Sequence, residues 1–275
     1  MVNLNRNGFQ AHNLKHVSVS QINKFREAPD SWLCQYLGGA KFPFGWAAIQ
    51  GVAVESGVEW ALFNNKPIKD AQRVAVEQMR SQAKFQKNIA ENLEKREPIV
   101  ERMVKVALEQ LEPLGIPQKP PKGSRQHQIN IPVRFADGEN GTINCMGYLD
   151  FYYPEENIIV DLKTTSKAPS RWSLSHGIQA SVYQKAVHVL RGSEHEINRP
   201  QVKFLYVLTR KTDPWIWLEM EDPDYYLGSF KKTITQMEKL LRLSDDKQVL
   251  IDAIPHNPDS FYWNDAQEIR QKFYG

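Results

Sequence analysis

Cysteine is scarce in this chain of 275 residues, which contains only Cys34 and Cys145. The two are far apart and form no C-x-x-C pair, so a zinc ribbon and a disulfide framework are excluded. Long apolar runs are missing too, because the N-terminal segment lacks the apolar core of a signal peptide and no later run approaches a membrane span. We therefore expect a protein of the reducing cytoplasm that does not enter a membrane.

The sequence also lacks repeats, low-complexity tracts and a strong excess of one charge. The formal net charge is +3, which permits nucleic-acid binding without requiring it, because acidic site residues can mask a basic groove in the total. Hydrophobic residues make up 41% and aromatic residues 11% of the chain, enough for a substantial core. The length fits one large domain or two small ones.

The first part of the chain has helical patterns. Ser20 is expected to cap a helix that Pro29 interrupts, and a second helix is expected over 46–63. The charged stretch 68–111 predicts two helices broken at Pro98. Its many lysines and arginines are typical of a solvated face, although some could line a nucleic-acid groove.

The second part predicts strands and helices in alternation, followed by a polar, irregular tail over 254–275. This order indicates an α/β fold with a helical elaboration before the sheet, in one domain over 1–275. Within it, residues 18–111 are expected to be mainly helical, 126–246 to form the sheet-containing core, and 247–275 to pack on that core as a C-terminal tail. The expected elements are strands at 126–135, 142–153, 157–165, 201–208 and 215–220, turns at Asp137-Gly138 and Asn140-Gly141, and helices at 225–243 and after Ser173 or Ser175.

The strands expected at 142–153 and 157–165 are predicted to form a β-hairpin, and each contains an aspartate. Asp150 is late in the first strand and Asp161 lies in the second, where Lys163 shares its face because side chains alternate. Two neighbouring carboxylates repel each other, and a hard divalent cation would relieve this by taking oxygen ligands from both. A lysine beside them could stabilise negative charge or position a water, so the hairpin has the parts of a metal-assisted hydrolase.

Glu55 and Glu59 lie four residues apart on one face of a helix rich in small residues. Glu55 is a candidate third oxygen ligand for the proposed metal, with Glu59 one turn further along. The alternative is a solvated polar face.

Four short motifs together resemble the PD-(D/E)XK nuclease superfamily, and within it the RecB-like branch of CRISPR-associated and phage exonucleases. They are Gly51-Val-Ala-Val-Glu55, Gly147-Tyr-Leu-Asp150, Asp161-Leu-Lys-Thr-Thr165 and Gln179-Ala-Ser-Val-Tyr183, preceded by an opening helix with Pro29 and Trp32. The resemblance implies a restriction-endonuclease-like core, a central mixed sheet flanked by helices.

The resemblance also implies roles for individual residues. Asp150, Asp161 and the carbonyl of Leu162 would bind Mg²⁺ or Mn²⁺, and Glu55 stands where many relatives have a metal-binding histidine. Lys163 would orient or activate the attacking water. Gln179 and Tyr183, four apart on one helix face, would organise the site or contact DNA, the alternative being a polar stripe of the helix.

One departure concerns iron. Relatives with an iron–sulfur cluster use one cysteine near the opening helix and three near the C-terminus, whereas Cys34 alone cannot supply four thiolates. We expect no iron–sulfur cluster. Phe261, Tyr262 and Trp263 are expected to hold the tail instead, as an apolar clasp.

The resemblance implies a metal-dependent DNA exonuclease that hydrolyses phosphodiester bonds at DNA ends, in recombination, repair or phage DNA processing. A structure-specific or nicking endonuclease and a non-catalytic DNA-binding subunit of a recombination complex are the alternatives. Arg171 and Trp172 could contact DNA by phosphate pairing and base stacking, although a packed surface tryptophan is equally consistent with the sequence. DNA ends, and a recombination or single-strand-annealing protein, are the expected partners in a bacterial or phage-infected cytosol.

Overall fold

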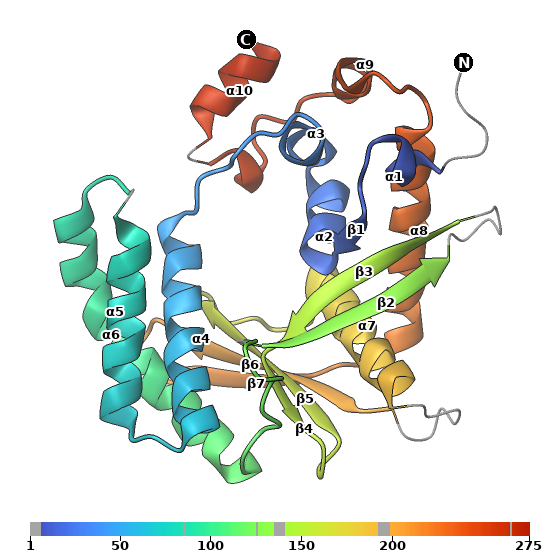
Figure 1. Cartoon of the computed structure of the whole chain (residues 1–275). Coiled ribbons are helices and arrows are strands. Elements are labelled where there is room, and N and C mark those ends of the chain that lie inside the picture. The colour runs from blue at the N-terminus through green and yellow to red at the C-terminus, as the bar shows by residue number, and fades with distance from the viewer. Residues whose placement is uncertain (1–6, 85, 125, 135–140, 192–198, 265) are drawn as a thin grey trace.

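The computed structural model describes residues 7–84, 86–124, 126–134, 141–191, 199–264 and 266–275. Its strands form a three-stranded sheet in the order β1-β3-β2 and a four-stranded sheet in the order β4-β5-β6-β7 (Figure 1). The strands are β1 His16–Ser18, β2 His127–Arg134, β3 Thr142–Leu149, β4 Phe151–Tyr153, β5 Ile158–Thr165, β6 Gln201–Leu208 and β7 Trp215–Glu219.

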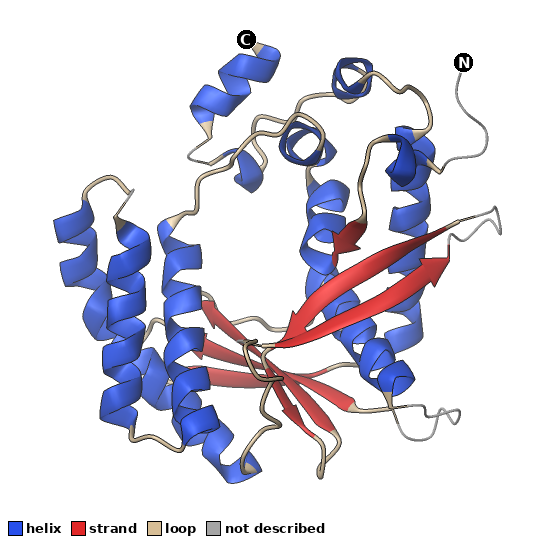
Figure 2. Cartoon of the chain, in the orientation of Figure 1, coloured by secondary structure: helices blue, strands red, loops and turns tan. Residues whose placement is uncertain are grey.

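Helices dominate the first part of the chain and flank the sheets (Figure 2). The helices are α1 Gly8–Ala11, α2 Val19–Glu27, α3 Pro29–Tyr36, α4 Trp46–Asn64, α5 Ile68–Ala83, α6 Ile89–Leu111, α7 Leu174–Leu190, α8 Pro223–Leu241, α9 Lys247–Asp252 and α10 Gln267–Tyr274, with short 3-10 turns at Glu112–Leu114 and Phe261–Trp263. None of the helices in the described ranges has both the length and the apolar character needed to cross a membrane.

The four-stranded sheet is mixed, since β5 and β6 run parallel while β4 and β7 are antiparallel to their neighbours. Alternation along β5 sends Val160 and Leu162 into the cluster formed with α4, α5 and α6, and Ile159 into the cluster that includes α7. Both faces of this sheet are therefore covered, which explains why β6 is apolar almost throughout.

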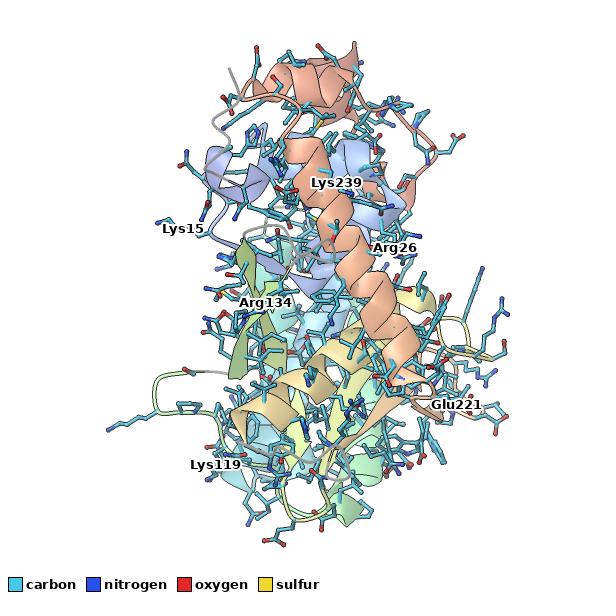
Figure 3. The ribbon with its side chains drawn as sticks, turned by 90° about the vertical axis from the view of Figure 1, so that its right-hand side faces the viewer. Lys15, Arg26, Lys119, Arg134, Glu221 and Lys239 are labelled. Carbon is cyan, nitrogen blue, oxygen red and sulfur yellow. The ribbon has the colours of Figure 1, made fainter. Side chains whose placement is uncertain are left out.

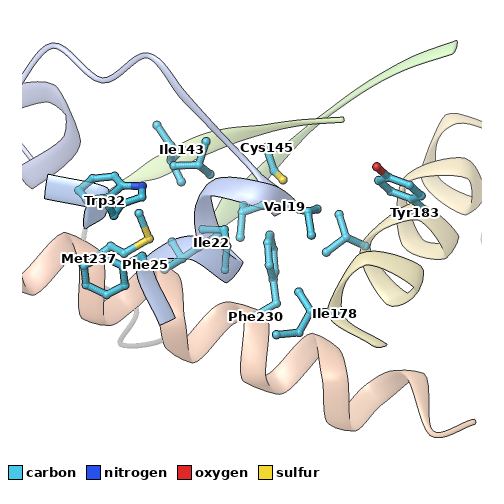
Figure 4. Packing of buried hydrophobic residues seen from close by; sticks show 14 of the residues in the cluster. Val19, Ile22, Phe25, Trp32, Ile143, Cys145, Ile178, Tyr183, Phe230 and Met237 are labelled. Carbon is cyan, nitrogen blue, oxygen red and sulfur yellow. The ribbon is translucent and has the colours of Figure 1, made fainter. Parts of the chain in front are cut away.

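Within the described ranges, the three-stranded sheet is covered on one face only. Its buried side chains pack with α2, α7 and α8, and Val19, Ile22, Ile178 and Phe230 lie in one hydrophobic cluster with Cys145 (Figure 4). The burial patterns of β2 and β3 alternate between buried and exposed residues, so the second face of this sheet is open.

The mixed α/β fold expected from the order of elements is confirmed, with a correction at the hairpin. β4 and β5 do pair, from Phe151 opposite Val160 to Tyr153 opposite Ile158. The strand expected over 142–153 is, however, two strands, because the chain leaves the three-stranded sheet at Leu149 and enters the four-stranded sheet at Phe151. Asp150 is the one residue between them.

Two helix boundaries also differ from the expectation. Ser18, not Ser20, caps α2, and its hydroxyl accepts a hydrogen bond from the backbone N–H of Gln21 at 3.2 Å. Pro98 lies inside α6 and does not break it. The interruption lies upstream of α6, where Asn88 adopts a left-handed conformation with φ of 51°. The expected turns at Asp137-Gly138 and Asn140 lie outside the described residues.

The tail is neither irregular nor held by three aromatic rings. It contains α10, and Trp263 is buried against Phe42 at 5.2 Å between ring centroids, whereas Phe261 is 68% exposed. A fully buried carboxylate adds a polar anchor that the sequence did not reveal. Asp30 Oδ2 accepts hydrogen bonds at 2.9 Å each from His256 Nδ1, Asn257 N and Trp263 Nε1.

Candidate active site

Asp150 sits where the two sheets meet. Because β4 pairs with β5 only as far as Val160, the edge of β5 beyond that point has no backbone partner on this side. Asp150 Oδ2 fills the gap by accepting a hydrogen bond from the backbone N–H of Leu162 at 2.8 Å. The N–H and C=O of one strand residue face the same edge, so the carbonyl of Leu162 points toward the same side as Asp150.

Asp161 and Lys163 share the face of β5 that α7 covers. Their ammonium and carboxylate groups, Nζ and Oδ2, form an ion pair. The Asp161 side chain is 1% exposed, whereas that of Lys163 is 27% exposed, so the lysine connects a buried carboxylate to the surface. In the parallel pairing with β6, Phe204 lies beside Asp161 and Tyr206 beside Lys163.

The start of α7 brings a polar stripe against this pair. Ser173 caps the helix by accepting from the backbone N–H of His176 at 3.1 Å, which fixes where its first turn begins. One turn later, Gln179 Nε2 donates to Asp161 Oδ1 at 2.8 Å and to the hydroxyl of Tyr183 at 3.1 Å. The helix therefore orients the buried carboxylate.

Glycines allow the close approach of two elements. A Cβ on Gly147 of β3 would stand 3.0 Å from the ring of Tyr183, and one on Gly51 of α4 would stand 3.1 Å from the hydroxyl of Thr164 on β5. Gly51 thus brings α4 close to the sheet one turn before Glu55. This spacing gives a physical reason for glycine in both motifs.

Glu55 reaches the site from α4, which packs on the opposite face of the four-stranded sheet from α7. Its Oε1 accepts a hydrogen bond from Gln126 Nε2. Its charge is among those that raise the pKa of Asp150 and the pKa of Lys163. Glu59, one turn further along, is only 4% exposed, so it is a buried group and not part of a solvated face.

The electrostatics of the site are those of an acidic cluster with one cation. Burial, followed by the charges of Asp161 and Glu55, raises the pKa of Asp150 well above its ordinary value. Burial opposes the charge of Lys163, but the carboxylates of Asp161, Asp150 and Glu55 outweigh it and raise its pKa. Additional positive charge would therefore be favourable beside Asp150.

The donor chemistry suits a hard divalent cation. Three carboxylates and a strand carbonyl are oxygen donors of the kind that Mg²⁺ and Mn²⁺ take, and their repulsion at Asp150 would be relieved by a cation. Across the described residues, no three acidic, histidine or cysteine side chains are already converged as a ready-made metal centre. Two of the carboxylates have other partners, since Gln126 engages Glu55 and the ammonium of Lys163 engages Asp161.

His176, Tyr206 and Phe204 surround Lys163 and were not among the predicted site residues. His176 Nδ1 and the Tyr206 hydroxyl are hydrogen-bonded at 2.6 Å, and the His176 ring stacks on Phe204 with 5.2 Å between centroids. Lys163 Nζ lies 5.5 Å from the centroid of Phe204. Burial and the Lys163 charge lower the pKa of His176 to about 4, so the imidazole is neutral near pH 7. The sequence could have indicated His176, because it lies three residues before Gln179 and therefore on the same helix face.

The two residues expected to contact DNA differ in their surroundings. Arg171 is exposed. The Trp172 ring packs edge-on against Phe204 at 4.6 Å between centroids, and its Nε1 donates to the carbonyl of Glu219. The structure thus favours the packed alternative for Trp172 over a base-stacking role.

Comparisons with known proteins identify a family and a similar fold. The family model of the PD-(D/E)XK nuclease superfamily matches residues 16–262. The fold is similar to a crystal structure from Eubacterium rectale provisionally named an exonuclease, with a TM-score of 0.55 and 15% identity over 86% of this chain and 85% of the other. The structure of SSO0001 is less similar, with a TM-score of 0.33 and 10% identity over 79% and 84% of the two chains. A search of curated proteins found no match.

Proposed function

Because this chain belongs to the PD-(D/E)XK nuclease superfamily, we propose that it is a metal-dependent exonuclease that hydrolyses phosphodiester bonds at DNA ends, in recombination, repair or phage DNA processing. The convergence of Asp150, Asp161 and Lys163, from the sheet junction and β5, is the observation that supports this activity. The fold relative provisionally named an exonuclease is consistent with it but is too distant to define a substrate.

Asp150, Asp161, the Leu162 carbonyl and Glu55 would hold Mg²⁺ or Mn²⁺. A bound divalent cation supplies activation of water, neutralisation of the scissile phosphate and stabilisation of the leaving oxygen. Glu55 would have to exchange Gln126 for the cation, and Asp161 would have to share its oxygen with Lys163.

Lys163 would act as a charged donor. The surrounding carboxylates keep its ammonium protonated, so it can donate hydrogen bonds to water or to phosphate oxygens but is poorly suited to take up a proton. Its partial exposure allows that contact without moving the strand.

Gln179 and Tyr183 would position Asp161 without contacting the reacting atoms. Gln179 donates to Asp161 Oδ1, which leaves Oδ2 directed toward Lys163. We expect substitution of Gln179, which is only partly buried, to weaken metal binding through the misplaced carboxylate more than it disturbs the fold, whereas Tyr183 is also a buried member of the core.

The decisive variant is Lys163→Ala. It should keep the fold and lose at least about 100-fold in cleavage rate, the cost of removing one preorganised donor from the charge that develops in the reaction. End-labelled single- and double-stranded DNA, with either end blocked, would be digested in Mg²⁺ and in Mn²⁺. The exposed Lys167→Ala, four residues away, is the matched control and should cleave normally.

The same assay separates the alternatives. A strict exonuclease leaves covalently closed circular DNA untouched, so cutting of that substrate would favour a nicking endonuclease. Binding of DNA without hydrolysis in either metal would favour a non-catalytic subunit. Undiminished cleavage by Lys163→Ala would refute the assigned role of the lysine.

A further inference from the structure

The three-stranded sheet has a second face that no described element covers. Every second residue of β2 and β3 is on this face, and the register places them in rows with β1, in which Asn130, Met146 and Ser18 are aligned. We define the open sheet face as the residues His16, Ser18, Gln128, Asn130, Pro132, Arg134, Thr142, Asn144, Met146 and Tyr148.

The open sheet face leads directly to the candidate active site. Tyr148, which is 49% exposed, is the last residue of β3 on this face and precedes Asp150 by two positions. Gln128 lies opposite it on β2, two residues after the Gln126 that engages Glu55. The end of the open sheet face and the acidic cluster are therefore neighbours along both strands.

The chemistry of this face suits a ligand that carries both negatively charged phosphates and planar bases. None of its ten residues is acidic, and Arg134 is a cation on it. Figure 3 shows Lys15, Arg134 and Lys119 along one side of the molecule. Amide side chains at Gln128, Asn130 and Asn144 add hydrogen-bond donors and acceptors, and the Tyr148 ring is free to meet a base on its exposed side.

The few cations and the exposed aromatic ring of this face favour a single strand over a duplex. Three strands about 4.8 Å apart give a strip roughly 10 Å wide, and eight residues of β3 give a length of roughly 25 Å. A single cation on this strip is few for a duplex, which carries one negative charge per about 1.7 Å of its axis, whereas the exposed Tyr148 ring can stack on the unpaired bases of a single strand.

We propose that the open sheet face binds the single-stranded segment of DNA that leads into the active site, with Tyr148 stacking on a base close to the scissile phosphate. This inference rests on the proposed nuclease function and adds the form of its substrate. Base–aromatic stacking and a short electrostatic track are the two terms that would hold the strand.

Binding can be measured by fluorescence anisotropy with a 20-nucleotide single strand and the corresponding blunt duplex, in Ca²⁺ to suppress cleavage. Tyr148→Ala should weaken single-strand binding by about fivefold or more. Tyr225→Ala is the matched control, because Tyr225 is 60% exposed on α8, which packs against the buried side of the sheet. Its affinity should equal that of the wild type.

Charge reversal tests the electrostatic track. For binding of the single strand, log K falls as log salt concentration rises. Arg134→Glu should make this negative slope shallower by about 0.7 or more. Lys232→Glu, an exposed charge reversal on α8, should leave this slope unchanged. Equal effects of the two reversals would indicate a general charge effect and overturn the assignment of this face.

A small phosphodiester separates this inference from the proposed function. Bis(p-nitrophenyl) phosphate is too short to reach along the sheet, so its hydrolysis by the wild type reports on the active site alone, and Tyr148→Ala should lose more activity on the long single strand than on this small ester. Normal DNA cleavage and binding by both face variants would overturn the inference alone. Equal weakening of duplex binding would overturn the single-strand assignment, and a wild type that cleaves no DNA would overturn the proposed function.

Discussion

Asp30 offers a quantitative test of how the C-terminal segment is held. Its carboxylate is fully buried at the start of α3 and accepts three hydrogen bonds from His256, Asn257 and Trp263. Asp30→Ala removes the acceptor and leaves three donors facing a cavity. Hydrogen bonds to a charged group contribute about 1.5–3 kcal/mol each, but they are not additive when they share one acceptor.

We expect Asp30→Ala to lower the free energy of unfolding by roughly 3–5 kcal/mol. At roughly 2–4 °C per kcal/mol for a chain of this size, Tm should fall by about 6 °C or more. Urea denaturation at pH 7 would give the free energy, and calorimetry the Tm. Asp30→Asn keeps the shape and one acceptor oxygen, so its cost should be smaller.

The exposed Asp259→Ala, in the same segment, is the control and should change stability by less than about 0.5 kcal/mol. A loss below about 1 kcal/mol for Asp30→Ala would refute the reasoning, because it would mean that the three donors find water or other partners at little cost.

Three other predictions concern packing, pH and metal. Gly177→Ala should destabilise by about 1–3 kcal/mol in urea, because its Cβ would meet the Tyr226 ring, whereas Gly228→Ala, in open space on α8, should stabilise by about 0.5–1 kcal/mol; equal effects would contradict the packing. Burial lowers the pKa of Lys24 to about 8, so above that pH the unfolded chain binds more protons than the folded chain. The free energy of unfolding of the wild type should therefore rise relative to that of Lys24→Met between pH 8 and 9.5. A difference between the two proteins that stays constant with pH would contradict this. Mn²⁺ should raise the Tm of the wild type and raise it less for Asp150→Asn, and an equal rise would argue against the proposed ligand set.

Local chemistry made much of the candidate site visible in the sequence. The D-x-K spacing puts Asp161 and Lys163 on one strand face, and the four-residue spacing puts Gln179 and Tyr183 on one helix face, whatever surrounds them. The ordered motifs also identified the family, which the match over residues 16–262 confirms. These features depend on period and order, which a sequence displays directly.

Other features depended on which segments meet. The residues around Asp150 do not reveal that β3 ends at Leu149 or that Asp150 accepts a hydrogen bond from the Leu162 N–H. Both features depend on the pairing of β4 with β5, which stops at Phe151 opposite Val160. Pro98 reads as a helix breaker, yet α6 continues through it because Val100, Met103 and Val104 are buried in the helical cluster and packing outweighs the propensity.

The sequence by itself determined the α/β order, the family and the residues with the right chemistry, since these are set by side-chain type and periodicity. Only the tertiary structure decided that Glu55 comes from the other side of the sheet, that His176 and Tyr206 stand beside Lys163, and that Trp263 is buried while Phe261 is exposed. Each of these depends on contacts between residues distant in the chain, whose burial and neighbours are fixed by packing and not by local pattern.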